Sequence, residues 1–152
     1  MSDERIMRST VRRDRASEER RMLRDWGLLL ACSLAIFFIN TRPDLKTTDD
    51  RFWGHVIAQA GHLLSHVVLG ALAWRAATRT FGHHLGYWLA YGASVVHAIV
   101  DEWVQMYVPT RSANIEDVLY NIAGVSLGIA LMEVWRWRAE RQALRHRRRG
   151  GS

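Results

Sequence analysis

The sequence predicts an all-α protein: a small polytopic membrane bundle of about four transmembrane helices, with both termini cytoplasmic. Three observations support this fold class. Apolar stretches recur at lengths near the ~20 residues that cross a bilayer, arginine gathers in two terminal arms, and tryptophan falls near the ends of the apolar stretches. We therefore divide the chain into a cytoplasmic Arg-rich arm (1–24), a transmembrane domain (25–137) and a cytoplasmic Arg-rich tail (138–152).

The average composition hides this organisation. Charged residues make up 24% of the chain and the mean hydropathy is -0.13, which resembles a soluble protein. Twenty of the 21 basic residues are arginine, most of them in the arms, so the formal charge of +6 describes the arms. Basic arms can bind nucleic acid. Here they adjoin apolar stretches, and membrane topology explains them more simply, so no nucleic-acid partner is expected.

The expected spans are separated by polar residues and one proline. The first is short for a complete crossing and requires Asp25 and Asn40 to lie near the headgroups. The third ends by Pro109, because proline cannot continue a helix. Asn114, followed three residues later by Asp117, predicts the N-cap of the fourth. In order, the four spans cover about 26–39, 53–74, 81–108 and 115–135.

The distribution of arginine orients the bundle. Both arms are basic, and so is the connection after the second span, which carries Arg75 and Arg79. These regions are expected in the cytoplasm, because cytoplasmic loops are enriched in arginine and lysine. The connection at 41–51 balances its charges, and the one around Arg111 has a single basic residue, so both are expected outside. An even number of spans agrees with this multi-pass topology.

Polar residues within the spans fall on common helix faces. At about 100° per residue, each of the last three spans carries a narrow stripe or wedge of polar or small residues, and Glu102 on the third points about 100° away from Asp101. Ionisable groups are expensive to expose to lipid, so we expect these faces to turn toward each other around a polar pocket that opens outward. The residues are His55, Gln59, His62 and His66 on the second span, His97, Asp101 and Gln105 on the third, and Asp117, Asn121, Gly124 and Gly128 on the fourth.

One arginine lies between the third and fourth spans, close in sequence to three acids. Arg111 supplies a permanent positive charge beside Asp101, Glu102 and Asp117. These groups either neutralise one another and fix the connection, or they leave Arg111 to bind an anionic ligand such as a lipid phosphate. The sequence alone leaves both interpretations open.

Two patterns resemble those of the VanZ-like membrane proteins, over about 26–135. The longer reads D-E-x-x-Q, then P-x-R, then D-x-x-x-N-x-x-G-x-x-x-G. The shorter, H-x-x-x-Y-x-x-L-G in the family, is echoed as H-x-x-x-H-x-x-L-G. The spacing G-x-x-x-G also lets a neighbouring helix approach closely. The matching residues are Asp101, Glu102, Gln105, Pro109, Arg111, Asp117, Asn121, Gly124 and Gly128, and upstream His62, His66, Leu69 and Gly70.

The chain departs from the family pattern at four positions. His66 stands where an aromatic residue is usual, Thr110 where glycine is common, Val104 where histidine is frequent, and Gln59 where lysine is often found. The acids, amides and arginine remain intact. The resemblance implies a bacterial plasma-membrane protein connected with the cell envelope, since the founding member is associated with teicoplanin-type glycopeptide resistance.

Three functional interpretations follow. The first, which is not enzymatic, is a pocket that binds or moves an anionic envelope lipid or a lipid-linked cell-wall precursor; it needs no cofactor. The second is an intramembrane metal-dependent hydrolase, with the metal held by His62, His66, His97 and Asp101. The third is a purely structural polar network. The pocket candidates are Asp101, Glu102, Gln105, Arg111, Asp117, Asn121, His62, His66 and His97, and the helix-packing glycines are Gly124, Gly128 and Gly70.

Overall fold

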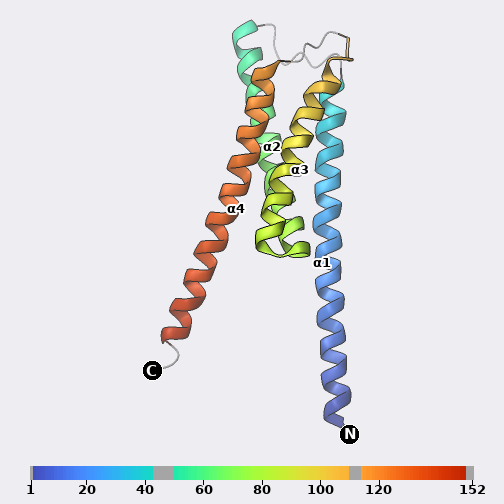
Figure 1. Ribbon diagram of the computed structural model, residues 1–152, viewed down its shortest axis with the longest axis vertical. Helices are drawn as coiled ribbons and strands as arrows, with labels where there is room; N and C mark the ends of the chain where they lie inside the picture. Colours follow the sequence, from blue (N-terminus) through green and yellow to red (C-terminus); the bar gives the residue numbers. More distant parts are fainter. Residues whose placement is uncertain (1, 43–49, 110–113, 150–152) are drawn as a thin grey trace.

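The computed structural model describes residues 2–42, 50–109 and 114–149, and these residues form helices and short turns without a strand (Figure 1). The all-α fold class is therefore confirmed. The first and last helices carry the two chain termini to one end of the bundle, which we call the termini end (Figure 1). The opposite end is the loop end. The helices are α1 (Ser2–Asn40), α2 (Arg51–Phe81), α3 (His83–Gln105) and α4 (Ile115–Arg149).

The first helix is longer than its apolar stretch indicated. α1 has 39 residues, because the Arg-rich arm continues the apolar part without a break. By length and composition, the described segments Thr10–Asn40, Phe52–Phe81 and Ile115–Arg147 can each cross a membrane. The expectation of a short first segment was therefore wrong. α3 lies outside that set, but its 23 residues rise ~34 Å, enough for the hydrocarbon core.

The boundary between the second and third helices also differs from the expectation. The sequence was interpreted as a connection containing Arg75 and Arg79, yet both residues lie within α2. The helix continues because the segment contains neither proline nor glycine, and because both guanidinium groups bind Asp25 of α1. Gly82 alone separates α2 from α3. Its φ of 78° lies in the region that glycine adopts most readily, so a single residue reverses the chain.

The third helix ends earlier than proline alone would require. Its last helical residue is Gln105, and the next three residues form turns whose N–H groups bind carbonyls three residues back. In one of these, the Val108 N–H binds the Gln105 carbonyl at 3.1 Å. The expected end at 108 was therefore wrong, because the chain tightens into turns before Pro109.

Helices α2 and α4 approach each other at glycines. A Cβ atom at Gly124 would overlap the carbonyl oxygen of Leu63, and one at Gly128 would overlap that of Val67. In the reverse direction, a Cβ at Gly70 would lie 2.7 Å from the carbonyl oxygen of Val125 on α4. All three predicted packing glycines thus lie where two backbones meet. This contact brings the polar faces of α2 and α4 within hydrogen-bonding distance.

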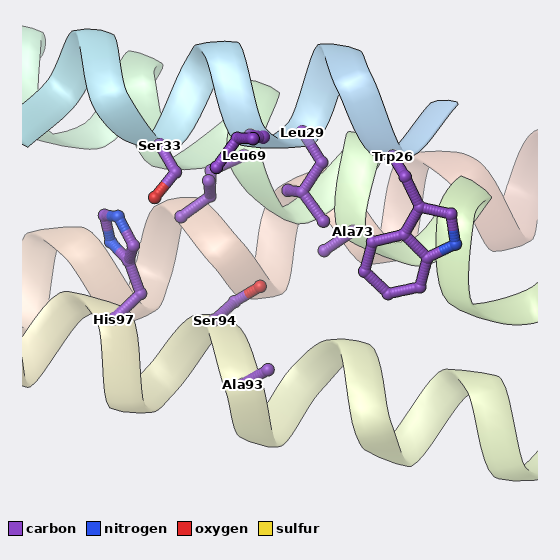
Figure 2. Close-up of a pocket in the computed structure, with 9 residues that line it drawn as sticks. Trp26, Leu29, Ser33, Leu69, Ala73, Ala93, Ser94 and His97 are labelled. Carbon is purple, nitrogen blue, oxygen red and sulfur yellow. The ribbon is translucent and has the colours of Figure 1, made fainter. Parts of the chain in front are cut away.

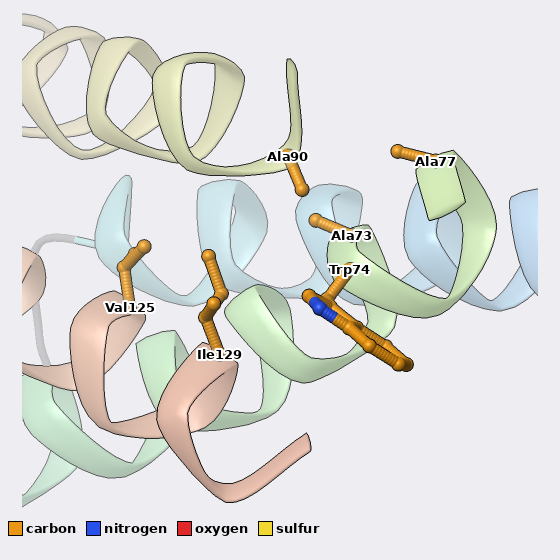
Figure 3. Close-up of a cluster of buried hydrophobic side chains, with 6 residues drawn as sticks. All are labelled: Ala73, Trp74, Ala77, Ala90, Val125 and Ile129. Carbon is orange, nitrogen blue, oxygen red and sulfur yellow. The ribbon is translucent and has the colours of Figure 1, made fainter. Parts of the chain in front are cut away.

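Small side chains also dominate the apolar core, which lies toward the termini end. Its residues come from α2, α3 and α4 and include three alanines (Figure 3). Large apolar side chains point outward instead: Leu64 is 62% exposed and Val96 is 59% exposed. Such an exterior suits lipid, and such an interior suits close packing. The core residues are Ala73, Trp74, Ala77, Ala90, Val125 and Ile129.

Helix α1 is attached to the other helices at two levels. Near the loop end, the Asn40 side chain donates a hydrogen bond to Asp101 of α3. Near the termini end, Asp25 is fully buried and binds both Arg75 and Arg79 of α2. These polar contacts give Asp25 and Asn40 protein partners, where the sequence suggested only headgroups.

Candidate functional site

Most of the predicted site residues gather in one place, in the half of the bundle toward the loop end. They project from α2, α3 and α4 into the interior, and seven of them are buried, while His97 and Asp117 are half-buried. We call this group the loop-end cluster. It consists of Gln59, His62, His66, His97, Asp101, Glu102, Gln105, Asp117 and Asn121.

Two of its acids bind side-chain amides on neighbouring helices. The Asn40 amide donates to Asp101 Oδ2 at 2.5 Å, which links α1 to α3. The Gln59 amide donates to Asp117 Oδ1 at 2.6 Å, which links α2 to α4. Hydrogen bonds to an ionised carboxylate are strong, so each acid stabilises a helix contact.

The third acid holds the beginning of α4. Glu102 Oε1 accepts from the backbone N–H of Asn114 at 2.7 Å, and its Oε2 accepts from the Gln105 amide at 3.1 Å. Asn114 caps α4 as predicted, because its side-chain oxygen accepts from the Glu116 N–H at 3.1 Å. Asp117 does not complete a reciprocal capping pair; it binds Gln59 instead.

The histidines form the inner part of the cluster. His62 Nδ1 lies 3.1 Å from Asn121 Oδ1, and His66 Nδ1 lies 3.0 Å from the His62 carbonyl oxygen. Because both oxygens can only accept, we assign the proton to Nδ1 in each ring. The Nε2 atom of His66 is then an acceptor. The rings of His66 and His97 meet edge to face, with centroids 5.7 Å apart.

Unpartnered polar atoms concentrate in this cluster. Among the described side chains, four buried polar atoms have no hydrogen-bond partner, and all four belong to cluster residues. Leaving a buried polar atom unpaired costs about 1–3 kcal/mol, so four together are unusual for a purely structural network. They offer two imidazole nitrogens, one amide donor and one amide acceptor. The atoms are Gln59 Oε1, His66 Nε2, His97 Nδ1 and Asn121 Nδ2.

An apolar cavity adjoins the cluster at His97. It lies between α1, α2 and α3 and has a volume of about 240 Å³ (Figure 2). Figure 2 shows the polar groups of Ser33 and His97 at one end, the Ser94 hydroxyl near the middle and the indole of Trp26 at the other end. Leucine and alanine side chains line the part between them. The cavity is therefore shaped for a molecule with one polar and one apolar part.

The set of residues considered for a metal is not arranged as a ligand group. No group of three or more His, Cys, Asp or Glu side chains in the described part of the chain is placed to hold a metal ion. The contacts show why: the His62 ring binds Asn121, Asp101 binds Asn40, and His66 meets His97 edge to face. A hydrolytic site built on these residues is therefore not supported by the geometry.

Several placements could not be read from the sequence. Arg111 lies outside the described residues. His55, which shares the stripe of α2, is exposed. Two further residues of the site, Asn40 and Ser94, were not predicted. Asn40 is an amide at the end of the first apolar stretch and Ser94 is a serine inside the third, and neither position indicates which residue or cavity it contacts.

The helices and the buried cluster define a small multi-pass membrane protein with a polar site toward one end. The family model described as VanZ/LLP1 matches residues 8–136. The chain therefore belongs to the VanZ family. The match begins at residue 8, within the N-terminal arm, and so extends upstream of the resemblance noted over about 26–135. No curated protein and no solved structure matches the chain significantly.

Proposed function

We propose that this protein binds an anionic, amphipathic lipid of the bacterial cell envelope, either an envelope lipid or a lipid-linked cell-wall precursor. The lipid's hydrocarbon chain occupies the cavity between α1, α2 and α3, and its charged head reaches the loop-end cluster, which faces outward. Both termini lie in the cytoplasm, and the membrane is the bacterial plasma membrane. The observation that carries the proposal is the apolar cavity that meets a cluster with unpartnered buried polar atoms at His97.

The apolar part of the site argues for a hydrocarbon chain. The cavity wall is formed by Leu29, Leu30 and Leu69, with Trp26 at the far end. Lipid tails are as apolar as leucine, so a chain gains little from leaving the bilayer. The cavity therefore determines where the hydrocarbon chain lies and which chain fits, and contacts to the polar head must supply most of the affinity for the lipid.

The polar part of the site argues for a charged head. The Nδ2 amide of Asn121 is a buried hydrogen-bond donor without a partner, and an anionic head can accept from it. Arg111 precedes Asn114 by only three residues, and its guanidinium suits a phosphate. Asp101 and Asp117 would repel an anion, but each accepts a hydrogen bond from a side-chain amide, whose N–H dipole partly offsets the negative charge of the carboxylate.

Replacing the arginine should release the lipid. Arg111→Ala is expected to lower the occupancy of a co-purifying anionic lipid about tenfold or more, because a hydrogen bond to a charged group stabilises binding by about 1.5–3 kcal/mol. The measurement is native mass spectrometry of protein extracted in mild detergent. Arg145→Ala in the C-terminal tail is the matched control and should keep the lipid.

A second readout connects this site with the envelope. Cells producing Arg111→Ala at normal protein levels should change in susceptibility to teicoplanin, while cells producing Arg145→Ala should not. Equal lipid occupancy in both variants, together with a lower melting temperature for Arg111→Ala, would show that the cluster only holds the helices. A stoichiometric metal that is lost in Asp101→Asn would favour the hydrolase instead.

Filling the cavity should weaken binding independently of charge. Ala93→Phe places a ring in the cavity from α3, and a steric conflict of about 1–3 kcal/mol should lower lipid occupancy about tenfold. The control is Val96→Phe on the exposed face of α3. If Ala93→Phe retains the wild-type lipid occupancy, the chain does not lie in this cavity, whatever Arg111 does.

A further inference from the structure

A second cavity, of about 570 Å³, lies at the other end of the membrane domain and has a different character. It is bounded by the last turns of α2, the start of α3 and the C-terminal half of α4, near the Gly82 turn. The α2–α3 turn points away from the loop end (Figure 1). We propose that this cavity binds the phosphate headgroup of an anionic membrane lipid. The lining residues used below are Trp74, Arg75, Arg79, His83, Trp135 and Arg136.

Positive charge exceeds negative charge on the α2 side of the cavity. Arg75 and Arg79 share one carboxylate, that of Asp25. Arg24 lies 3.6 Å from the same carboxylate, so three guanidinium groups surround one negative charge. Each guanidinium has five N–H donors, more than a single carboxylate can accept. This side can therefore bind a further anion.

On the α4 side of the cavity, positive and negative charges are more nearly equal in number. Glu133 accepts from His83 at 2.8 Å, from the Trp74 indole at 2.7 Å and from Arg136 at 3.1 and 3.2 Å. Arg136 also binds Glu140 at 2.6 Å. These contacts fix the wall opposite α2 and leave the excess charge on Arg75 and Arg79. An anion is thus expected to bind toward α2.

The surroundings favour a lipid over a soluble phosphate compound. Trp74 and Trp135 line the cavity, and tryptophan concentrates where hydrocarbon meets headgroups. Both Arg-rich arms leave the bundle at this end (Figure 1). Basic pockets between transmembrane helices on the cytoplasmic side are suited to acidic head groups. A lipid can bind the guanidinium groups with its phosphate and contact the apolar wall with its hydrocarbon, whereas free phosphate can bind only the guanidinium groups.

The test compares full-length protein in nanodiscs of phosphatidylcholine alone with nanodiscs that also contain phosphatidylglycerol. Native mass spectrometry measures retained phosphatidylglycerol, and thermal unfolding measures the stabilisation it provides. Arg79→Gln should lower retention about fivefold, because one arginine near an anionic surface contributes about 1 kcal/mol. Arg75 still binds Asp25 in that variant, so α1 keeps its contact with α2. Arg145→Gln in the tail should behave like the wild type.

A second variant changes retention in the opposite direction. Asp25→Asn removes the negative charge beside Arg75 and Arg79, so retention should rise even though the contact between α1 and α2 weakens. If both variants lose stability while retention stays constant, the arginines are structural and the proposal is overturned. If inorganic phosphate in pure phosphatidylcholine stabilises the protein as much as phosphatidylglycerol does, the lipid assignment is overturned. The effects of Arg79→Gln and Asp25→Asn on retention should persist in an Arg111→Ala background, which removes anionic lipid from the proposed loop-end site, so failure here is distinguishable from failure of that site.

Discussion

Gly128→Val is expected to lower the free energy of unfolding by about 3 kcal/mol, because the new side chain meets the backbone of α2. The obstacle is the carbonyl oxygen of Val67, and a backbone atom cannot rotate aside as a side chain can. The steric overlap is removed only if α2 and α4 move apart. Unfolding of the purified protein in a denaturing detergent series measures the loss.

Separation of these helices should also abolish the loop-end cluster. The Gln59–Asp117 and His62–Asn121 hydrogen bonds both cross from α2 to α4. Lipid occupancy should therefore fall together with stability. The matched control is Gly92→Val on α3, because a Cβ at Gly92 meets nothing within 4 Å. Equal stability of the two variants would mean that α4 does not pack on α2 at Gly128.

Asp25→Asn is expected to lower the free energy of unfolding by about 2 kcal/mol. Asp25 is fully buried, and its loss leaves Arg75 and Arg79 without their shared carboxylate. Breaking a fully buried pair costs about 3–5 kcal/mol. The effect here is smaller, because the Arg75 and Arg79 side chains are 37% and 32% exposed.

The same unfolding measurement checks this value. Glu19→Gln changes an exposed acid on the same helix and serves as the control, for which a change within ~0.5 kcal/mol is expected. If Asp25→Asn also stays within that range, the ion pairs contribute nothing measurable and α1 is held by its other contacts, among them the Asn40–Asp101 hydrogen bond.

Helix faces were predictable because they depend on the local period of the sequence. Gln59, His62 and His66 recur on one face of α2, and Asp117 and Asn121 on one face of α4. Burial of these residues, or half-burial in the case of Asp117, follows from the high free energy of a polar group in lipid. The same reasoning identified Gly124 and Gly128 as places where another helix approaches, and both contact α2.

Partners across helices were not predictable, because they depend on rotation and register between segments far apart in sequence. Asn40 binds Asp101 across 61 positions, and Asp25 binds Arg79 across 54. The misplaced end of α2 has the same origin: residues that appear to form a basic connection remain helical because α1 supplies a carboxylate. Gly82 was not singled out, since a single glycine in a helical pattern does not necessarily end it.

Helix α1 is joined to the rest of the protein near the ends of its apolar half, and a cavity lies between those two junctions. A helix supported in this way can bow in its middle while both junctions stay closed. An apolar molecule can then enter the cavity laterally from the surrounding bilayer, without passing through water.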